Sequence, residues 1–124
     1  MTPLRILIVD DNEMFQDLIA RFIKGLEGTE VIASARTGEE ALSAVAAHHP
    51  DVVVIDLNMP YDGATKAPRA IKEQFPETRV YLCSAHPDDT LEESARQLLA
   101  DGFISKSSLK AGLTEMVKNE QARA

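Results

Sequence analysis

The sequence contains a single cysteine, Cys83, among its 124 residues. One thiol cannot form an internal disulfide, so the chain is not a small disulfide-stabilised secreted protein, and a reducing compartment is expected. No apolar run approaches the length of a membrane span. The opening MTPLRILIVDD has only a short apolar run before two aspartates, which excludes a secretion signal. These absences predict a cytoplasmic protein with no membrane partner.

Basic side chains are also scarce. The 13 lysines and arginines stand against 20 acidic residues, a formal net charge of −7. Such a surface repels phosphate backbones and anionic lipid, so direct binding to nucleic acid or membrane is not expected. The length suits one compact domain with a real core and is too short for two.

Five short, mostly apolar runs alternate with segments of helical periodicity. The runs span residues 5–10, 30–35, 51–57, 79–85 and 102–106. Runs that are apolar at every position suit strands covered on both faces. Strict alternation of strand and helix therefore predicts an α/β fold, with a five-stranded parallel sheet and helices on both of its faces.

The helical segments have recognisable patterns and ends. Seven residues form one apolar stripe in the first: Met14, Phe15, Leu18, Ile19, Phe22, Ile23 and Leu26. The second opens on a capping box of Thr37 and Glu40. The third is expected to begin at Pro68 and to stop before Pro76. The fourth is expected to start near Asp89 or Thr90 and to end at Gly102, and the fifth to run from about Ser108.

Polar residues collect where the predicted strands end, which is where parallel sheets bind ligands. They are Asp10, Asp11, Asp56, Ser84 and Lys106. Each close pair of carboxylates costs about 4 kcal/mol at an effective dielectric near 20, so protonation or a bound cation is required. Because the ligands are all oxygen, Mg²⁺ is favoured over Ca²⁺ or Zn²⁺.

A carboxylate beside a metal and a lysine can also accept a phosphoryl group. Asp56 can act as the nucleophile and form an acyl phosphate. The metal and Lys106 would neutralise charge on the transferring oxygens, and Ser84 would donate a hydrogen bond to one of them. The sequence therefore predicts a phosphoryl-acceptor site.

These residues together resemble a response-regulator receiver domain over the whole chain. The resemblance rests on Asp10-Asp11, on Asp56 within DLNMP, on Ser84-Ala85, and on Phe103 and Lys106, in that order. It implies one receiver domain over residues 1–124, with a flavodoxin-like (βα)5 fold, doubly wound, and strand order 2-1-3-4-5. It also implies a signalling role in which the domain catalyses only its own phosphorylation and dephosphorylation.

The resemblance implies a role for each residue. Asp56 would take a phosphoryl group from a sensor histidine kinase or a phosphotransfer protein. The Mg²⁺ (or Mn²⁺) would be held by Asp11, Asp56 and the backbone carbonyl of Asn58, with Asp10 holding a coordinated water.

The resemblance also implies which residues respond to the phosphoryl group. Lys106 would contact the phosphoryl group. Ser84 and Phe103 would switch, changing the surface of the fourth helix, fifth strand and fifth helix that controls a downstream protein or an output domain. The chain would be a monomer or a weak, phosphorylation-dependent dimer.

The sequence departs from the family pattern in two places. Asp62-Gly63 comes one residue early, which together with Pro68 predicts a longer loop after the third strand and a shorter third helix. Ser107-Ser108 after Lys106 resembles the subfamily whose full-length members often carry a helix-turn-helix output domain.

Simpler interpretations remain for several of these residues. Aspartates commonly cap helices or form turns. His86 either tunes hydrolysis of the phosphoryl group or is an exposed loop histidine. A residue such as Phe103 is more often simply a core aromatic, and its switching role is implied by the resemblance alone.

Two other functions also remain. One is an aspartate-nucleophile hydrolase of the haloacid-dehalogenase type. Such enzymes carry a general-acid aspartate two residues after the nucleophile, and Asn58 at that position argues against this function because an amide cannot donate and regain a proton. The other is a degenerate receiver that acts only as a binding surface.

Overall fold

The protein alternates strands and helices along the part of the chain that the computed structural model describes, residues 2–57, 63–85 and 88–123. The elements are β1 (Leu4–Val9), α1 (Glu13–Lys24), β2 (Thr29–Ala35), α2 (Gly38–His48), β3 (Val52–Asp56), α3 (Gly63–Gln74), β4 (Arg79–Ser84), α4 (Asp88–Gln97), β5 (Gly102–Ser105) and α5 (Leu109–Arg123), with a 3-10 turn η1 (Lys106–Ser108) before α5.

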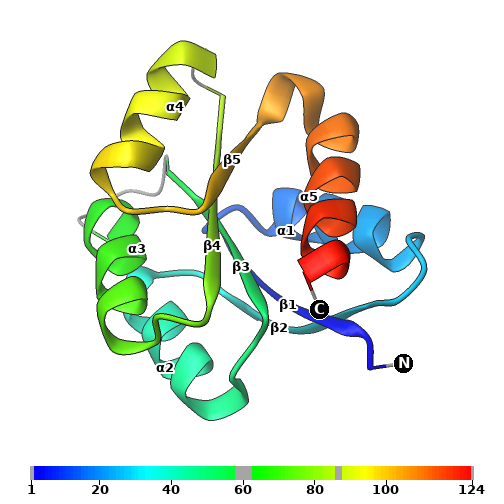
Figure 1. Cartoon of the computed structure of the whole chain (residues 1–124), viewed down its shortest axis with the longest axis horizontal. Helices are drawn as coiled ribbons and strands as arrows, with labels where there is room; N and C mark the ends of the chain where they lie inside the picture. Colours follow the sequence, from blue (N-terminus) through cyan, green and yellow to red (C-terminus); the bar gives the residue numbers. More distant parts are fainter. Residues whose placement is uncertain (1, 58–62, 86–87, 124) are drawn as a thin grey trace.

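The five strands form one parallel sheet in the order β2-β1-β3-β4-β5. Helices α1 and α5 cover one face, and α2, α3 and α4 cover the other (Figure 1). Both the fold class and the strand order predicted from the sequence are confirmed. Within the described ranges, no helix combines the length and the apolar character that crossing a membrane requires.

The central strand β3 explains why its sequence is apolar throughout. All five of its residues are buried, because each face of the sheet carries its own hydrophobic cluster. On the α5 side the helix approaches the sheet closely at Gly112. A Cβ there would come within 2.7 Å of Ile104 Cγ2, so a glycine is needed for α5 to pack directly on β5.

Helix α1 begins at an asparagine cap and packs on the core with most of the predicted apolar stripe, namely Phe15, Ile19, Phe22, Ile23 and Leu26. Asn12 Oδ1 accepts a hydrogen bond from Phe15 N at 3.0 Å. The buried side chains are Gln16, Ile19 and Ile23. Two members of the predicted stripe are instead exposed, Met14 to 82% and Leu18 to 52%, which is a correction. Gln16, which is outside the predicted stripe, is also buried, because it donates hydrogen bonds at the edge of the sheet, as described below.

Helix α2 has half of the predicted capping box. Thr37 Oγ1 accepts a hydrogen bond from Glu40 N at 3.0 Å, as expected. The Glu40 carboxylate, however, accepts from Arg36 N at 3.3 Å and so reaches one residue further back than the motif predicts. The helix ends at His48, and His49 closes it in a left-handed conformation with φ of 48°.

Helix α3 begins five residues earlier than predicted. It starts at Gly63 and contains Pro68 in its interior, so the prediction of a shorter third helix was wrong. An interior proline removes one backbone hydrogen bond and crowds the preceding turn. Ala67 and Ile71 lie one turn apart and are buried against the sheet, and their burial keeps the segment helical through the proline.

Helix α4 ends at Gln97, not at Gly102 as predicted. Leu99 adopts the left-handed conformation, with φ of 61°. Ala100 N donates to Ala95 O at 2.9 Å and Leu99 N donates to Arg96 O at 3.3 Å, which is the Schellman pattern of a helix end. Glycine is usual at the left-handed position, and a leucine there is not recognisable as a helix end from the sequence. Gly102 instead begins β5.

Candidate functional site

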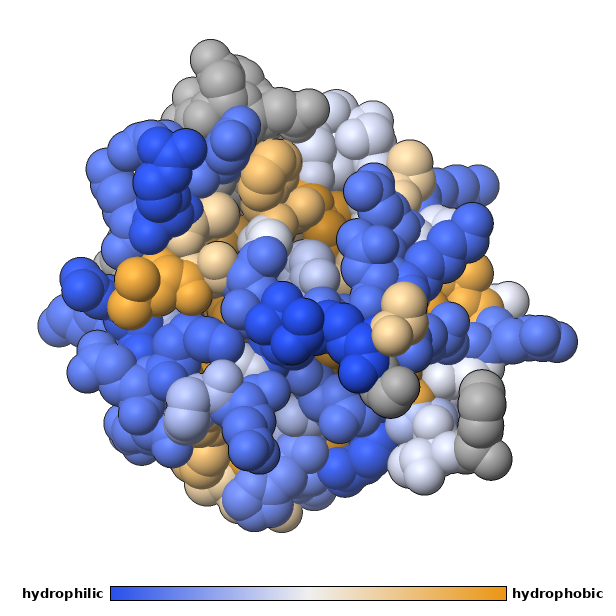
Figure 2. Space-filling view, in the orientation of Figure 1, coloured by the Kyte–Doolittle hydropathy of each residue, from blue (hydrophilic) through white to orange (hydrophobic). Residues whose placement is uncertain are grey.

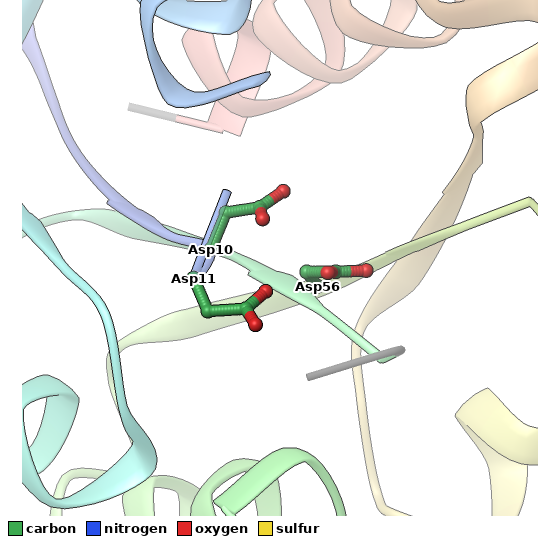
Figure 3. A group of neighbouring side chains, drawn as sticks. All are labelled: Asp10, Asp11 and Asp56. Atoms are coloured by element: carbon green, nitrogen blue, oxygen red, sulfur yellow. The ribbon is translucent and has the colours of Figure 1, made fainter. Parts of the chain in front are cut away.

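Three carboxylates meet where β1 and β3 end. Asp10 and Asp11 directly follow β1, and Asp56 is the last residue of β3. The two strands are parallel neighbours with Val9 opposite Ile55, so their ends reach the same edge of the sheet. One ligand oxygen from each residue lies within 4.8 Å of the others. Figure 3 shows the three side chains directed into a shared space.

The Asp10 carboxylate is buried and incompletely bonded. It is 1% exposed, and its Oδ1 accepts a hydrogen bond from Asn12 N at 2.9 Å. Its Oδ2 has no hydrogen-bond partner among the residues that the structure describes. Burial raises the pKa of Asp10 above its ordinary value of 3.8, and the Asp56 and Asp11 carboxylates add to the rise, whereas Asn12 N–H and Lys106 oppose it.

Lys106 supplies the positive charge of the site. It follows β5, at the same edge of the sheet, and its side chain is only 16% exposed. Its Nζ lies 3.3 Å from Asp56 Oδ1 and 3.6 Å from Asp10 Oδ2. The ammonium also lies 4.0 Å from the centre of the Phe15 ring. The structure therefore brings together the predicted Asp10, Asp11, Asp56 and Lys106.

The end of β4 contributes buried, uncharged groups to this edge. Ser84 is fully buried and lies opposite Ser105 of β5 in the register of the two parallel strands. Cys83 is opposite Asp56 in the sheet, and burial is the largest cause that raises the pKa of its thiol to about 12. Cys83 is thus a buried strand residue, as predicted. Phe103 is half-buried in β5 and packs on the α2–α3–α4 side of the sheet. Asn58 and His86 lie outside the described residues.

Gln16 is a structural residue of the site that the sequence interpretation missed. It is 8% exposed, and its Nε2 donates hydrogen bonds to Asp10 O at 2.6 Å and to Ala35 O at 2.9 Å. These bonds fasten α1 to the ends of β1 and β2, next to the carboxylates. A signal was available in the sequence. Gln16 precedes Ile19 by three positions and Ile23 by seven, which puts all three residues on the same inward face of the helix.

The raised pKa of Asp10 predicts how stability changes with pH in metal-free protein. A raised pKa means that the folded state holds the proton more tightly than the unfolded state does, so ionisation of Asp10 costs stability. That cost is absent below about pH 3.8 and grows as pH rises through the raised pKa. Asp10→Asn should therefore increase the free energy of unfolding at pH 7 by about 1 kcal/mol, the cost of a buried polar atom left without a partner.

Urea unfolding of the metal-free protein in a chelator, at a series of pH values from below 3.8 up to 7, measures the effect. The gain of Asp10→Asn over wild type should grow with pH, and adding Mg²⁺ should stabilise wild type more than the variant. A variant that is equally destabilised at every pH would contradict the prediction.

The chain matches the response regulator receiver domain family over residues 6–118. It therefore belongs to that family and is a receiver domain of the response regulators of two-component systems, a class of signalling domain. Membership favours the signalling hypothesis over the hydrolase.

Its relatives include several bacterial regulators. It is 36% identical over 117 residues to the positive alginate biosynthesis regulatory protein of Pseudomonas aeruginosa, covering 93% of this chain and 46% of that protein. It is 30% identical to the transcriptional regulatory protein DegU of Brevibacillus brevis, covering 93% of this chain and 49% of that protein. The chain spans about half the length of the curated relatives it matches.

Solved structures show the same fold. The signal receiver domain of the response regulator NarL from Mycobacterium tuberculosis superimposes with a TM-score of 0.86 at 28% identity, covering 96% of each chain. A LuxR-family response regulator from Aurantimonas gives a TM-score of 0.89 at 29% identity, covering 98% of this chain and 86% of that one.

Proposed function

We propose that this receiver domain accepts a phosphoryl group on Asp56 from the phosphohistidine of a sensor histidine kinase or a phosphotransfer protein. The observation that carries the proposal is the Lys106 ammonium, 3.3 Å from Asp56 Oδ1 and 3.6 Å from Asp10 Oδ2. In the reaction an Asp56 oxygen forms a bond to phosphorus as the phosphorus–nitrogen bond to the donor imidazole breaks. Lys106 is already in place to balance the charge of the incoming group.

The acidic cluster fits Mg²⁺, or Mn²⁺ in its place. Its donors are all oxygen, they lie within 4.8 Å of one another, and Asp10 Oδ2 is buried without a hydrogen-bond partner among the described residues. Asp11 and Asp56 would hold the ion directly together with the backbone carbonyl of Asn58, and Asp10 would hold a coordinated water. When bound, the dication neutralises the carboxylates and the phosphoryl oxygens.

Ser84 and Phe103 carry the response in this proposal. The Ser84 hydroxyl, buried at the end of β4, would donate a hydrogen bond to a phosphoryl oxygen. Phe103 would rotate into the space that the hydroxyl leaves, and so alter the face formed by α4, β5 and α5. Figure 2 shows hydrophobic residues gathered between α4 and α5, over β5, within a mostly hydrophilic surface. An apolar patch with a polar border suits recognition of a downstream protein.

The partners follow from this mechanism. We propose that residues 1–124 form a single receiver domain, which binds its phosphodonor and a protein target or output domain. The net charge of −7 disfavours direct contact between this domain and nucleic acid. The curated relatives that match are about twice as long, and one is a transcriptional regulatory protein, so control of a transcriptional output is the favoured use of the signal.

Treatment with acetyl phosphate and Mg²⁺ tests the proposal. Intact-mass measurement should show one added phosphoryl group, absent when the metal is chelated. Reduction with borohydride converts an aspartyl phosphate to homoserine, and peptide mapping should place this product at position 56. Modification elsewhere would contradict the proposal, and a protein that neither takes the group nor binds Mg²⁺ would be a receiver that acts only as a binding surface.

A further inference from the structure

The Lys106 ammonium contacts an aromatic ring as well as two carboxylates. Its Nζ lies 4.0 Å from the centre of the Phe15 ring, on α1, a distance at which the negative face of the ring attracts a cation. A lysine side chain is a flexible four-carbon stem whose charge is strongly hydrated, so two carboxylates do not by themselves fix where the ammonium lies. Phe15 supplies a third contact from another direction.

Lys106 lies beside a groove that is open to solvent. It lines, together with Phe15, Leu18 and Phe22, a groove of about 720 Å³ between α1 and the start of α5. The groove is open to solvent, and an ammonium that turned into it would regain hydration. Because Phe15 is at the boundary between groove and site, removing its ring would enlarge the groove beside Lys106.

Phe15 is itself fixed by the acidic site. Asp10 Oδ1 accepts a hydrogen bond from Asn12 N, and Asn12 Oδ1 accepts one from Phe15 N. Lys106 then returns from the Phe15 ring to Asp10 Oδ2. These contacts link Asp10, Asn12, Phe15 and Lys106 in a ring of interactions. The helix cap that starts α1 therefore also determines where the Phe15 ring lies relative to the carboxylates.

Phe22 offers a comparison for the packing of Phe15. Phe15 and Phe22 are both half-buried on α1, and both pack against the cluster beneath α1 and α5. They line the same groove. Among the described residues it is Phe15 whose ring faces the lysine ammonium. Phe22 therefore provides a matched control for packing without the contact.

We propose that Phe15 is a positioning residue for Lys106. The Phe15 ring holds the Lys106 ammonium beside Asp56 before the phosphoryl group arrives. The inference rests on the proposed function. A charge placed in advance stabilises the developing negative charge without reorganisation during the reaction. Phe15 is not a metal ligand in this scheme, so replacing it removes no ligand from the Mg²⁺ site.

Three variants test this: Phe15→Leu, Phe15→Tyr and Phe22→Leu. The rate of phosphorylation by acetyl phosphate at saturating Mg²⁺ should fall roughly fivefold in Phe15→Leu, the factor that corresponds to an ordinary cation–π contact. It should stay near wild type in Phe15→Tyr, which keeps the ring, and in Phe22→Leu. The Kd for Mg²⁺, from NMR titration, should not rise in any of the three, because none of the changes removes a metal ligand.

A second readout needs no phosphorylation. The Phe15 ring should shift the NMR signals of the Lys106 ε-methylene upfield in wild type and in Phe15→Tyr, and the shift should vanish in Phe15→Leu. If wild type is phosphorylated but Phe15→Leu reacts as fast as Phe22→Leu, or keeps the shift, the inference is overturned and the proposed function stands. A wild-type protein that takes no phosphoryl group overturns the proposed function and the inference with it.

Discussion

Replacing Asp56 with asparagine is expected to abolish acetyl-phosphate-dependent phosphorylation of the protein. An amide oxygen is a poor nucleophile, and the change also removes one of three carboxylates that lie within 4.8 Å of one another. Lys106, 3.3 Å from Asp56 Oδ1 in wild type, would lose this carboxylate partner and keep its ion pair with Asp10. Intact-mass measurement under conditions in which wild type is fully modified checks the result.

The matched control is Asp17→Asn, which makes the same chemical change on the exposed surface of α1. It should be phosphorylated like wild type. Because asparagine is nearly the size of aspartate and Asp56 is buried, circular dichroism and urea unfolding should show that Asp56→Asn remains folded. A folded Asp56→Asn protein with a normal yield of phosphorylation would remove the basis of the proposed function.

Replacing Asp101 with alanine is expected to lower the free energy of unfolding by about 3 kcal/mol, the scale for breaking a largely buried ion pair. The Asp101 side chain is 13% exposed. Its Oδ2 accepts hydrogen bonds from Val80 N at 2.7 Å and Lys72 Nζ at 3.0 Å, and its Oδ1 pairs with Arg79 at 3.0 Å. Alanine would remove the carboxylate that pairs with Lys72 and Arg79, which keep their other acceptors, and the acceptor of the Val80 N–H. Urea unfolding monitored by circular dichroism measures the loss.

Glu93→Ala is the control for the Asp101 prediction. Glu93 pairs with Arg96 on α4 at 3.1 Å, but both side chains are more than half exposed, so its loss should change stability by less than about 0.5 kcal/mol. Asp101→Asn, which keeps an acceptor for Val80 N, should lose less stability than alanine does. Equal effects of Asp101→Ala and Glu93→Ala would show that the buried network contributes little.

The sequence predicted the elements and the acidic cluster because both depend on topology. Once runs of apolar residues are assigned to parallel strands, Asp10, Asp56 and Lys106 must lie at one edge of the sheet, whatever the details of packing. Their geometric convergence needed no knowledge of side-chain contacts.

What the sequence did not predict depends on contacts between distant residues. The burial of Gln16 depends on its amide, which reaches the carbonyl of Ala35, nineteen residues away. The end of α4 depends on Leu99 in a left-handed conformation, which leucine rarely adopts. Asp101 looks like a loop residue in the sequence, and its partners Lys72 and Arg79 come from α3 and β4. Residue spacing does not identify the distant partner in any of these contacts.

The burial of Cys83 makes the protein convenient for site-directed spectroscopy. The thiol is 1% exposed, and because burial raises its pKa to about 12 it is almost entirely protonated at neutral pH. Thiol reagents attack thiolates, so the folded protein should resist them. A cysteine introduced on the surface of α4 or α5 can therefore receive a fluorophore or spin label without first mutating the native thiol.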